Sequence, residues 1–305
     1  MKRVSWLIPV RDDPRLIDAL RSIAPELGPD DEVIVVDDGS AVPVEPEIGP
    51  RIGPRIGNSH GIPGVTVLRQ GRDGIVAALN RGLERAAGVY IARMDADDLV
   101  LPGRIAAQLA AFTADDVAIA GRVRTDAPQM QAYVRWVNHN DPMAERLIES
   151  PLIHPASLLR ASAVRKIGGY RRGDFPEDYD LFLRLADIGR LARVPQEVLI
   201  WRDGPARLTR TDARYAYPAA VGLKQRWLEP RITGQRVALT GEALTGEALT
   251  GEAWTRWLAQ RCTRTEVADA QIVLVAAEGE RDEARARLRA QRPDLLEGHD
   301  LWMLA

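Results

Sequence analysis

The chain has 305 residues, a formal net charge of −2, 46% hydrophobic residues, 28% charged residues and a mean hydropathy of −0.20. This composition is ordinary for a soluble globular protein, and it gives no electrostatic reason to expect binding to nucleic acid or to an anionic membrane surface. The single cysteine, Cys262, excludes an internal disulfide and a cysteine-based metal cluster. Because the chain has neither an apolar run of transmembrane length nor a signal-peptide pattern, we expect a cytoplasmic protein without a transmembrane segment.

The first forty residues predict a strand, a helix and a second strand. Residues 4–8 form an apolar run, and leucine and isoleucine then recur at helical spacing from Leu16 onward. Residues 33–36 are all β-branched, which is typical of a strand buried on both faces. A strand, helix and strand in this order form the βαβ unit of a parallel sheet.

The alternation continues toward the middle of the chain. We expect strands at 65–68, 89–92, 117–120 and 198–201, and helices at 74–87, 101–112 and 161–166. The predicted fold class is therefore α/β, with a mostly parallel sheet that carries helices on both faces. Residues 41–64 interrupt the pattern with glycine, proline and an I-G-P-R repeat, and we interpret them as a surface insertion.

Three acidic residues, Asp95, Asp97 and Asp98, follow the predicted strand at 89–92. Ligands bind at the carboxyl ends of strands in an open α/β sheet. Asp95 and Asp97 are two residues apart, so on an extended chain they face the same way and offer two hard oxygen donors, which suit Mg²⁺ or Mn²⁺. The alternative is a solvated acidic turn or a helix cap.

Two further acidic pairs lie at comparable places. Asp37 and Asp38 end the strand at 33–36, where the alternative to a nucleotide site is a plain turn. Glu177 and Asp178 begin a predicted helix, where carboxylates are favoured by the helix dipole and where a general base would be held in place. Capping of the helix is the alternative for this pair.

Two other residues are candidates with weaker support. His154 precedes a proline, and a single histidine of this kind is more often structural than catalytic. Arg202 follows the last predicted strand and begins a loop that is rich in arginine, whose forked guanidinium groups suit phosphates.

With these residues in place, residues 5–210 resemble the family 2 glycosyltransferases, which are inverting enzymes of the GT-A fold. The shared motifs are I-P-V at 8–10, V-D-D-G-S at 36–40, A-L-N at 78–80, D-A-D-D at 95–98 with Pro102 after it, and E-D-Y-D-L at 177–181. The chain departs from the family at 11–13, where it has Arg-Asp-Asp instead of the common Tyr-Asn.

The resemblance implies a role for each matching residue. Asp38 would hydrogen-bond the base of a nucleotide-sugar donor, most simply a UDP-sugar, beside the backbone of Pro9. Asp97 would bind Mn²⁺ or Mg²⁺ directly, and Asp95 would hold the ribose or a metal-bound water. Asp178 would take the proton from the hydroxyl group of an unidentified acceptor.

The resemblance also divides the chain into a GT-A domain at 1–230 and a small α/β module at 231–305. The module contains three T-G-E-A-L-type repeats and resembles a degenerate Rossmann unit, but it lacks the G-x-G-x-x-G pattern of a dinucleotide site. We expect it to pack on the first domain or to form homo-oligomer contacts.

Two alternatives to a metal-dependent inverting glycosyltransferase remain. A sugar-nucleotide pyrophosphorylase would need a glycine-rich basic loop after the first strand, and residues 9–14 do not form one. A catalytically inactive scaffold or sensor that binds sugar nucleotides would keep the fold, and the intact acids Asp38, Asp97 and Asp178 argue against it.

Overall fold

The computed structural model describes residues 3–44, 65–143, 146, 149–204, 212–215, 219–220, 222–224 and 226–227. Most of the predicted insertion at 41–64 and the whole predicted module at 231–305, with both families of repeats, lie outside the described residues.

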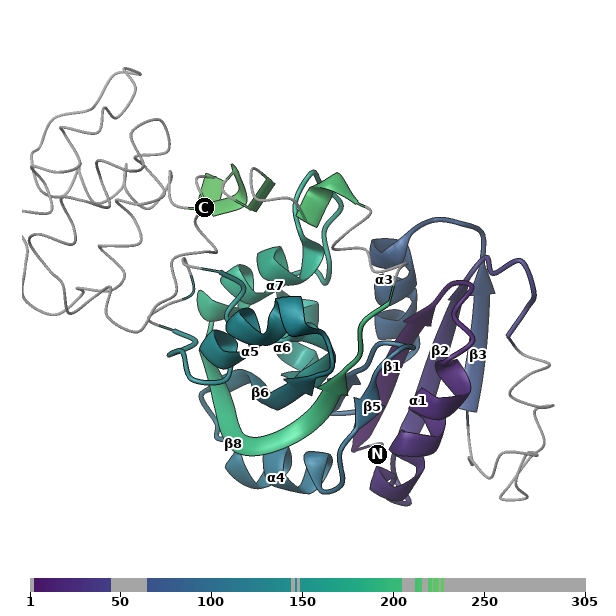
Figure 1. The fold of residues 1–305 in the computed structure, drawn as a ribbon, viewed down its shortest axis with the longest axis horizontal. Coiled ribbons are helices and arrows are strands. Elements are labelled where there is room, and N and C mark those ends of the chain that lie inside the picture. Colours follow the sequence, from purple (N-terminus) through teal and green to yellow (C-terminus); the bar gives the residue numbers. More distant parts are fainter. Residues whose placement is uncertain are drawn as a thin grey trace, which may run out of the picture.

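A single mixed sheet forms the centre of the described structure (Figure 1). Its strands are β1 (Val4–Val10), β2 (Glu32–Asp38), β3 (Val65–Gln70), β4 (Tyr90–Arg93), β5 (Leu99–Val100), β6 (Asp116–Thr125), β7 (Ser157–Arg160) and β8 (Arg190–Trp201). They are ordered β3-β2-β1-β4-β7-β6-β8-β5. The first four are parallel, which confirms the predicted βαβ beginning, whereas β7 runs antiparallel to both of its neighbours.

Helices cover both faces of this sheet, as predicted. They are α1 (Leu16–Ile23), α3 (Ile75–Arg85), α4 (Arg104–Ala111), α5 (Gln131–Val137), α6 (Ala161–Lys166) and α7 (Glu177–Ala186). One apolar cluster joins side chains of α1, α4 and α5 to the sheet, and a second joins α3, α6 and α7 to its other face.

The alternation of side chains along the strands explains this division. In β1, Trp6 and Ile8 belong to the cluster with α1, whereas Leu7 belongs to the cluster with α3. Because successive side chains of a strand point to opposite faces, a strand that lies between two helical layers must be apolar at every position. All four residues of 33–36 are fully buried, as their β-branched run predicted.

The first strand is longer than predicted, since it continues through Pro9 to Val10. Proline lacks an N–H group and normally stays out of central strands. Here the pairing of β1 with β4 ends at Leu7, so Pro9 pairs only with Val36 of β2. The missing donor therefore falls where β1 has a neighbour on one side only.

The segment after the D-A-D-D motif also differs from the prediction. Leu99 and Val100 form β5, which pairs with β8, and α4 begins at Arg104 rather than at Leu101. A two-residue strand is too short to show a periodicity in the sequence. Its existence depends entirely on the strand with which it pairs.

The second half of the sheet was largely missed from sequence. β7 was not predicted at all, and β8 begins at Arg190, eight residues before the predicted strand at 198–201. The early part of β8 carries exposed polar residues and a proline, so it has no continuous apolar run. Figure 1 shows this strand curving along the lower edge of the molecule.

None of the helices in the described ranges combines the length and apolar character that crossing a membrane requires.

Candidate active site

Three carboxylates meet in the turn that follows β4. One oxygen atom from each of Asp95, Asp97 and Asp98 lies within 4.8 Å of the others. The chain here is a turn and not the extended segment that we expected, so the turn itself brings the side chains together. Asp98 is fully buried, while the side chains of Asp95 and Asp97 are 29% and 20% exposed. The two partly exposed carboxylates are open to a ligand.

Each of these aspartates has a cationic or N–H partner from a different segment. Arg93 of β4 forms an ion pair with Asp95. The Nη2 atom of Arg15, from the loop before α1, lies 3.2 Å from Oδ2 of Asp97. The backbone N–H of Arg202 donates to Oδ1 of Asp98 at 2.9 Å.

Arg202, a weaker candidate from sequence, thus belongs to this site. Its Nε also donates to the backbone carbonyl of Asp97, and its Nη1 lies 3.8 Å from Asp18 of α1. Since Arg202 follows β8 directly, the last strand of the sheet helps to hold the D-A-D-D turn in place.

Asp178 lies half-buried in the first turn of α7. Burial raises the pKa of its carboxyl to about 7, and the neighbouring Glu177 adds to the rise. Its Oδ1 accepts a hydrogen bond from the backbone N–H of Tyr179 at 2.8 Å. A carboxylate with such a pKa is a suitable proton acceptor near neutral pH.

Glu177 is buried and held by a partner from beyond β8. The hydroxyl group of Tyr215 donates to its Oε2 at 2.6 Å. Burial also raises the pKa of Glu177, although the hydrogen bond from Tyr215 opposes that rise. The two adjacent carboxyls of α7 therefore differ in environment, since Glu177 has a fixed partner and Asp178 is the more exposed.

Arg93 connects the turn after β4 with the start of α7. Its side chain is 3% exposed, and besides pairing with Asp95 it lowers the pKa values of Glu177 and Asp178. Asp95 and the pair of carboxyls at the start of α7 therefore lie within electrostatic range of one guanidinium group. Arg93 was not among the candidates predicted from sequence. An arginine at the end of a buried apolar strand is nevertheless a signal, because a buried charge requires a partner.

The third acidic pair lies at the end of β2. Asp37 is buried, accepts the N–H of Ser40 at 2.8 Å and lies 2.5 Å from Nη1 of Arg69. These contacts hold the turn that follows the strand. The side chain of Asp37 is only 1% exposed, so its carboxylate is not accessible to a ligand.

Asp38 lies beside the start of α3. Its Oδ1 accepts hydrogen bonds from Gln70 Nε2 and from the backbone N–H groups of Asp73 and Gly74, at 2.9, 2.9 and 3.0 Å. Its Oδ2 lies 3.6 Å from Nη1 of Arg11. Asp38 thus stabilises the loop before α3, and its second oxygen faces the residue that follows the I-P-V motif.

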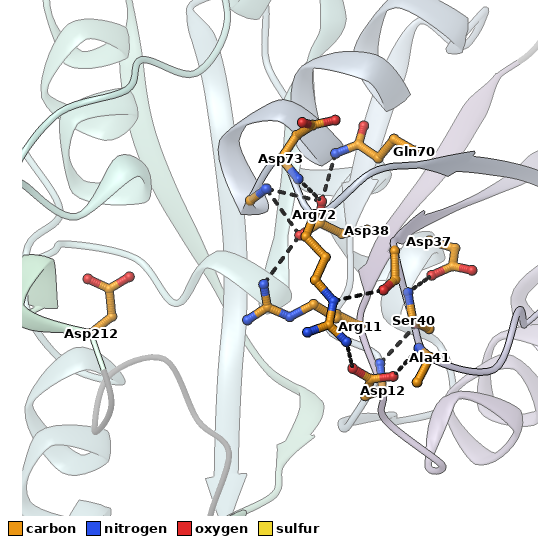
Figure 2. Close-up of polar contacts among 12 residues, drawn as sticks. Arg11, Asp12, Asp37, Asp38, Ser40, Ala41, Gln70, Arg72, Asp73 and Asp212 are labelled. Atoms are coloured by element: carbon orange, nitrogen blue, oxygen red, sulfur yellow. Dashed lines mark hydrogen bonds and ion pairs between the residues drawn. The ribbon is translucent and has the colours of Figure 1, made fainter.

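Two arginines surround this end of β2 (Figure 2). Arg11 is directed at Asp38, and Arg72 donates to the carbonyl of Gly39 at 3.1 Å and pairs with Asp12 at 3.3 Å. Gly39 has φ +71°, and a Cβ atom there would lie 2.9 Å from Cγ of Arg72. The glycine is therefore needed for the turn and for the close approach of the Arg72 loop.

Pro9, at the end of the neighbouring strand, is buried and pairs with Val36. Because β1, β2 and β4 are parallel, Pro9, Asp38 and Asp95 all lie toward the same edge of the sheet. The acids thus lie where the sequence placed them, at the carboxyl ends of parallel strands.

His154 lies in the core as a structural residue, which is the interpretation that the sequence favoured. It is 4% exposed, its Nε2 lies 2.7 Å from the hydroxyl oxygen of Tyr170, and its ring meets Phe182 edge-on. Burial holds its pKa well below the usual value, so it is a neutral core histidine. Asn80, from the A-L-N motif, in turn exchanges two hydrogen bonds with the backbone of Tyr170.

Two buried polar residues of α4 hold the end of β4, just before the D-A-D-D turn. Arg104 donates to the carbonyls of Arg93 and Ser157 at 2.8 and 3.1 Å, and it lies over the ring of Trp6. Gln108 donates to the carbonyl of Ala156 at 2.8 Å. Sequence periodicity gave no sign of this pair, because a charged residue on a helix is ordinarily exposed.

Comparison with curated proteins finds glycosyltransferases among the relatives of this chain. The amylovoran biosynthesis glycosyltransferase AmsE of Erwinia amylovora is 30% identical over 148 residues, which are 47% of this chain and 56% of that protein. The pre-mycofactocin glycosyltransferase of Mycobacterium tuberculosis is 28% identical over 232 residues, which are 70% of this chain and 45% of that protein. The chain thus spans about half the length of these relatives.

Solved structures show the same fold. Staphylococcus aureus TarS 1–349 in complex with UDP-GlcNAc has a TM-score of 0.56 at 13% identity, covering 96% of this chain and 88% of that one. The mannosyltransferase PcManGT from Pyrobaculum calidifontis, in complex with GDP-Man and Mn²⁺, has a TM-score of 0.53 at 18% identity, covering 92% and 86%. This likeness confirms the GT-A-type α/β fold.

The family model described as glycosyl transferase family 2 matches residues 5–171, which is more than half of the chain. The match contains the ends of β1, β2 and β4 with all the acidic residues of the D-A-D-D turn. The chain belongs to glycosyl transferase family 2.

Proposed function

We propose that this protein transfers a sugar from a nucleotide-diphosphate donor to an acceptor hydroxyl group, with a divalent metal ion and with inversion at the anomeric carbon. The single observation that supports the proposal best is the position of Arg93, which pairs with Asp95 and acts electrostatically on Asp178. One buried guanidinium group thus interacts with both the candidate metal site and the candidate base.

The residues of the D-A-D-D turn fit a divalent cation. Mn²⁺ and Mg²⁺ prefer oxygen ligands, and the three carboxylates offer one oxygen each within 4.8 Å of one another. Asp97 is the proposed direct ligand, with Asp95 beside it. When bound, the cation would neutralise the charge that builds on the leaving diphosphate.

The nucleotide of the donor would lie along the same edge of the sheet. Asp38 and the backbone near Pro9 are the proposed contacts to its base, with Arg11 and Arg72 alongside. Arg11 lies in the segment 11–13 that replaces the common Tyr-Asn of the family, so it is the side chain that would distinguish this base site from that of its relatives. UDP- and GDP-sugars both remain candidates.

Asp178 would act as the general base. The acceptor oxygen would bond to the anomeric carbon while the bond from that carbon to the diphosphate oxygen breaks, and the hydroxyl proton would pass to Asp178. The raised pKa of this carboxyl supports the assignment, because a base is most effective when its pKa lies near the working pH.

The metal proposal is tested by replacing Asp97 with alanine. We expect calorimetry of the intact chain to show UDP or GDP binding that requires Mn²⁺ and is lost in EDTA, since Asp97 would hold the cation that offsets the negative charge of the diphosphate. Asp97→Ala should lose this metal-dependent binding while its melting temperature stays close to that of the wild type. Equal nucleotide affinity in Mn²⁺ and in EDTA would contradict the metal proposal.

A scaffold or sensor that binds sugar nucleotides without catalysis would give the same binding data. It is distinguished by incubating the protein with Mn²⁺ and a panel of UDP-, GDP- and dTDP-sugars, and by following release of the nucleoside diphosphate. Metal-dependent binding of a donor without any transfer to supplied acceptors or to water would favour the scaffold.

A further inference from the structure

Arg15 is the residue of the site whose position the proposed function leaves unexplained. Its guanidinium group lies 3.2 Å from Oδ2 of Asp97, so a cation already contacts the carboxylate that is the proposed metal ligand. The contact is part of a larger arrangement, because the same group pairs with Asp13 at 2.8 Å and donates to the carbonyl of Asp203 at 2.9 Å.

These contacts fix the side chain of Arg15 within the site, unlike that of a solvated surface arginine. Its side chain is 27% exposed, and it packs so closely against Gly204 that a Cβ atom there would lie 2.8 Å from Nη2. The hydrogen bond that Arg15 donates to Asp13 is the main cause that raises the pKa of Arg15, and the charges of Asp97 and Asp98 raise it further. Arg15 therefore stays charged beside Asp97.

A metal ion bound to Asp97 would meet this charge. A carboxylate oxygen binds Mn²⁺ or Mg²⁺ at about 2.0–2.2 Å, so an ion on Asp97 would lie within a few ångströms of the guanidinium group. Two positive charges this close repel each other, and the repulsion grows with the double charge of the metal ion. The diphosphate of a donor carries the negative charge that can offset this repulsion.

We propose that Arg15 is a resident counter-cation that makes metal binding at Asp97 depend on the donor. Without a donor, Arg15 neutralises Asp97 and opposes the metal ion. With a donor, the guanidinium group pairs with the diphosphate, for which its forked donors are well suited, and the metal ion binds Asp97. This inference rests on the proposed function and adds to it a positive coupling between metal and nucleotide.

The test is a binding experiment on the full chain. Calorimetry measures the affinity for Mn²⁺ alone, for Mn²⁺ with saturating UDP or GDP, and for each nucleotide with and without Mn²⁺. In the wild type we expect weak binding of Mn²⁺ alone and much tighter binding once the nucleoside diphosphate is present. Because coupling between two ligands is reciprocal, each should tighten the other by the same factor.

Arg15→Gln should change the affinity for Mn²⁺ alone and the coupling factor in opposite directions. We expect Mn²⁺ alone to bind about tenfold tighter, since a repulsive charge is gone, and the coupling factor between Mn²⁺ and nucleotide to fall by about tenfold. Arg15→Lys retains the charge and should keep the weak binding of Mn²⁺ alone. A residue that merely supported the loop would weaken both ligands when replaced.

Arg85→Gln is the matched control, because it removes one positive charge at the opposite edge of the sheet, where Arg85 lies 3.9 Å from Glu32 at the start of β2. It should leave both affinities unchanged. Unaltered or weaker binding of Mn²⁺ alone by Arg15→Gln, with normal behaviour of the wild type, would overturn the role of Arg15 only. A wild type that binds no Mn²⁺ even with UDP or GDP would overturn the proposed metal site as well.

If Arg15→Gln does not fold, Arg15→Lys and the double variant Arg15→Lys/Asp97→Asn decide the question. The lysine variant should retain the coupling, and the added Asp97→Asn should abolish it. A lysine variant that folds as the wild type does but has lost the coupling would overturn the charge-based account.

Discussion

Asp178 and Glu177 are adjacent carboxyls that the proposed mechanism uses differently. Asp178→Asn keeps the shape of the side chain and cannot accept a proton. We expect kcat to fall by about 10²–10⁴-fold, the usual contribution of a general base, with little change in the affinity for the donor. Transfer kinetics with a donor identified by nucleotide release would measure both quantities.

Glu177→Gln is the control for that change. Glu177 is buried and accepts a hydrogen bond from Tyr215, so its replacement should lower the melting temperature. It should reduce kcat less than Asp178→Asn does. If both variants have mild kinetic effects that follow their melting temperatures, the two carboxyls serve only to begin α7. A product that retains the anomeric configuration would also remove Asp178 from the role of base.

The pH dependence of the reaction follows from the raised pKa of Asp178. The base must be deprotonated, so kcat/KM should rise with pH and level off above about 7. We expect this acidic limb to be absent from the residual activity of Asp178→Asn. A profile of kcat/KM between pH 5 and 9 at saturating Mn²⁺ measures the limb, and a limb that persists in the variant would assign it to another group.

The same shift has an opposite consequence for stability. A carboxyl whose folded pKa lies above its unfolded value stabilises the fold below the unfolded pKa, and this contribution is lost as the pH rises through the folded pKa. For Asp178 that window lies between about 4 and about 7. Asp178→Asn should therefore melt a few degrees above the wild type at pH 8 and close to it at pH 4, as thermal melts can show.

At the scale of elements, α4 holds the end of β4 through Arg104. Arg104→Met keeps the bulk of the side chain but leaves the carbonyls of Arg93 and Ser157 buried without their donor. Such unsatisfied groups cost about 1–3 kcal/mol each, so we expect the free energy of unfolding in urea to fall by about 3 kcal/mol.

Arg85→Met is the control for this prediction, since Arg85 is 50% exposed and its replacement should change stability by less than about 0.5 kcal/mol. An Arg104→Met protein as stable as the control would show that the two carbonyls find other partners. Because the carbonyl of Arg93 lies two residues before Asp95, we also expect the less stable variant to bind Mn²⁺ and nucleotide more weakly.

At the scale of the whole molecule, all the proposed site residues precede the predicted boundary at residue 230. A chain truncated after residue 230 should therefore bind Mn²⁺ and UDP or GDP as the full chain does, and neither protein should bind NAD. Calorimetry measures the binding, and size-exclusion chromatography compares the two proteins. If the full chain elutes as a larger oligomer and the truncated one as a monomer, the predicted module at 231–305 forms the oligomer contacts.

Loss of nucleotide binding by a soluble truncated chain would contradict this division of the chain. The same size and stability for both proteins would contradict the prediction that the module packs on the first domain or joins chains together.

The sequence by itself determined the alternation of strands and helices from residue 4 to about residue 120, and with it the edge of the sheet at which the acids lie. These features depend on local patterns, namely buried β-branched runs, helical periodicity and acidic turns at strand ends. Parallel strands of one sheet have their carboxyl ends at the same edge, so Asp38 and Asp95 could be assigned to one edge.

Only the tertiary structure decided which cations belong to the acids. The guanidinium groups of Arg15 and Arg93 pair with Asp97 and Asp95, and the backbone N–H of Arg202 donates to Asp98. These three arginines come from separate segments, so the contacts depend on how those segments pack. The local sequence around a charged residue does not reveal which distant residue it contacts. For the same reason β5 and β7 could not be predicted, because a strand of two to four residues exists only through the neighbours with which it pairs.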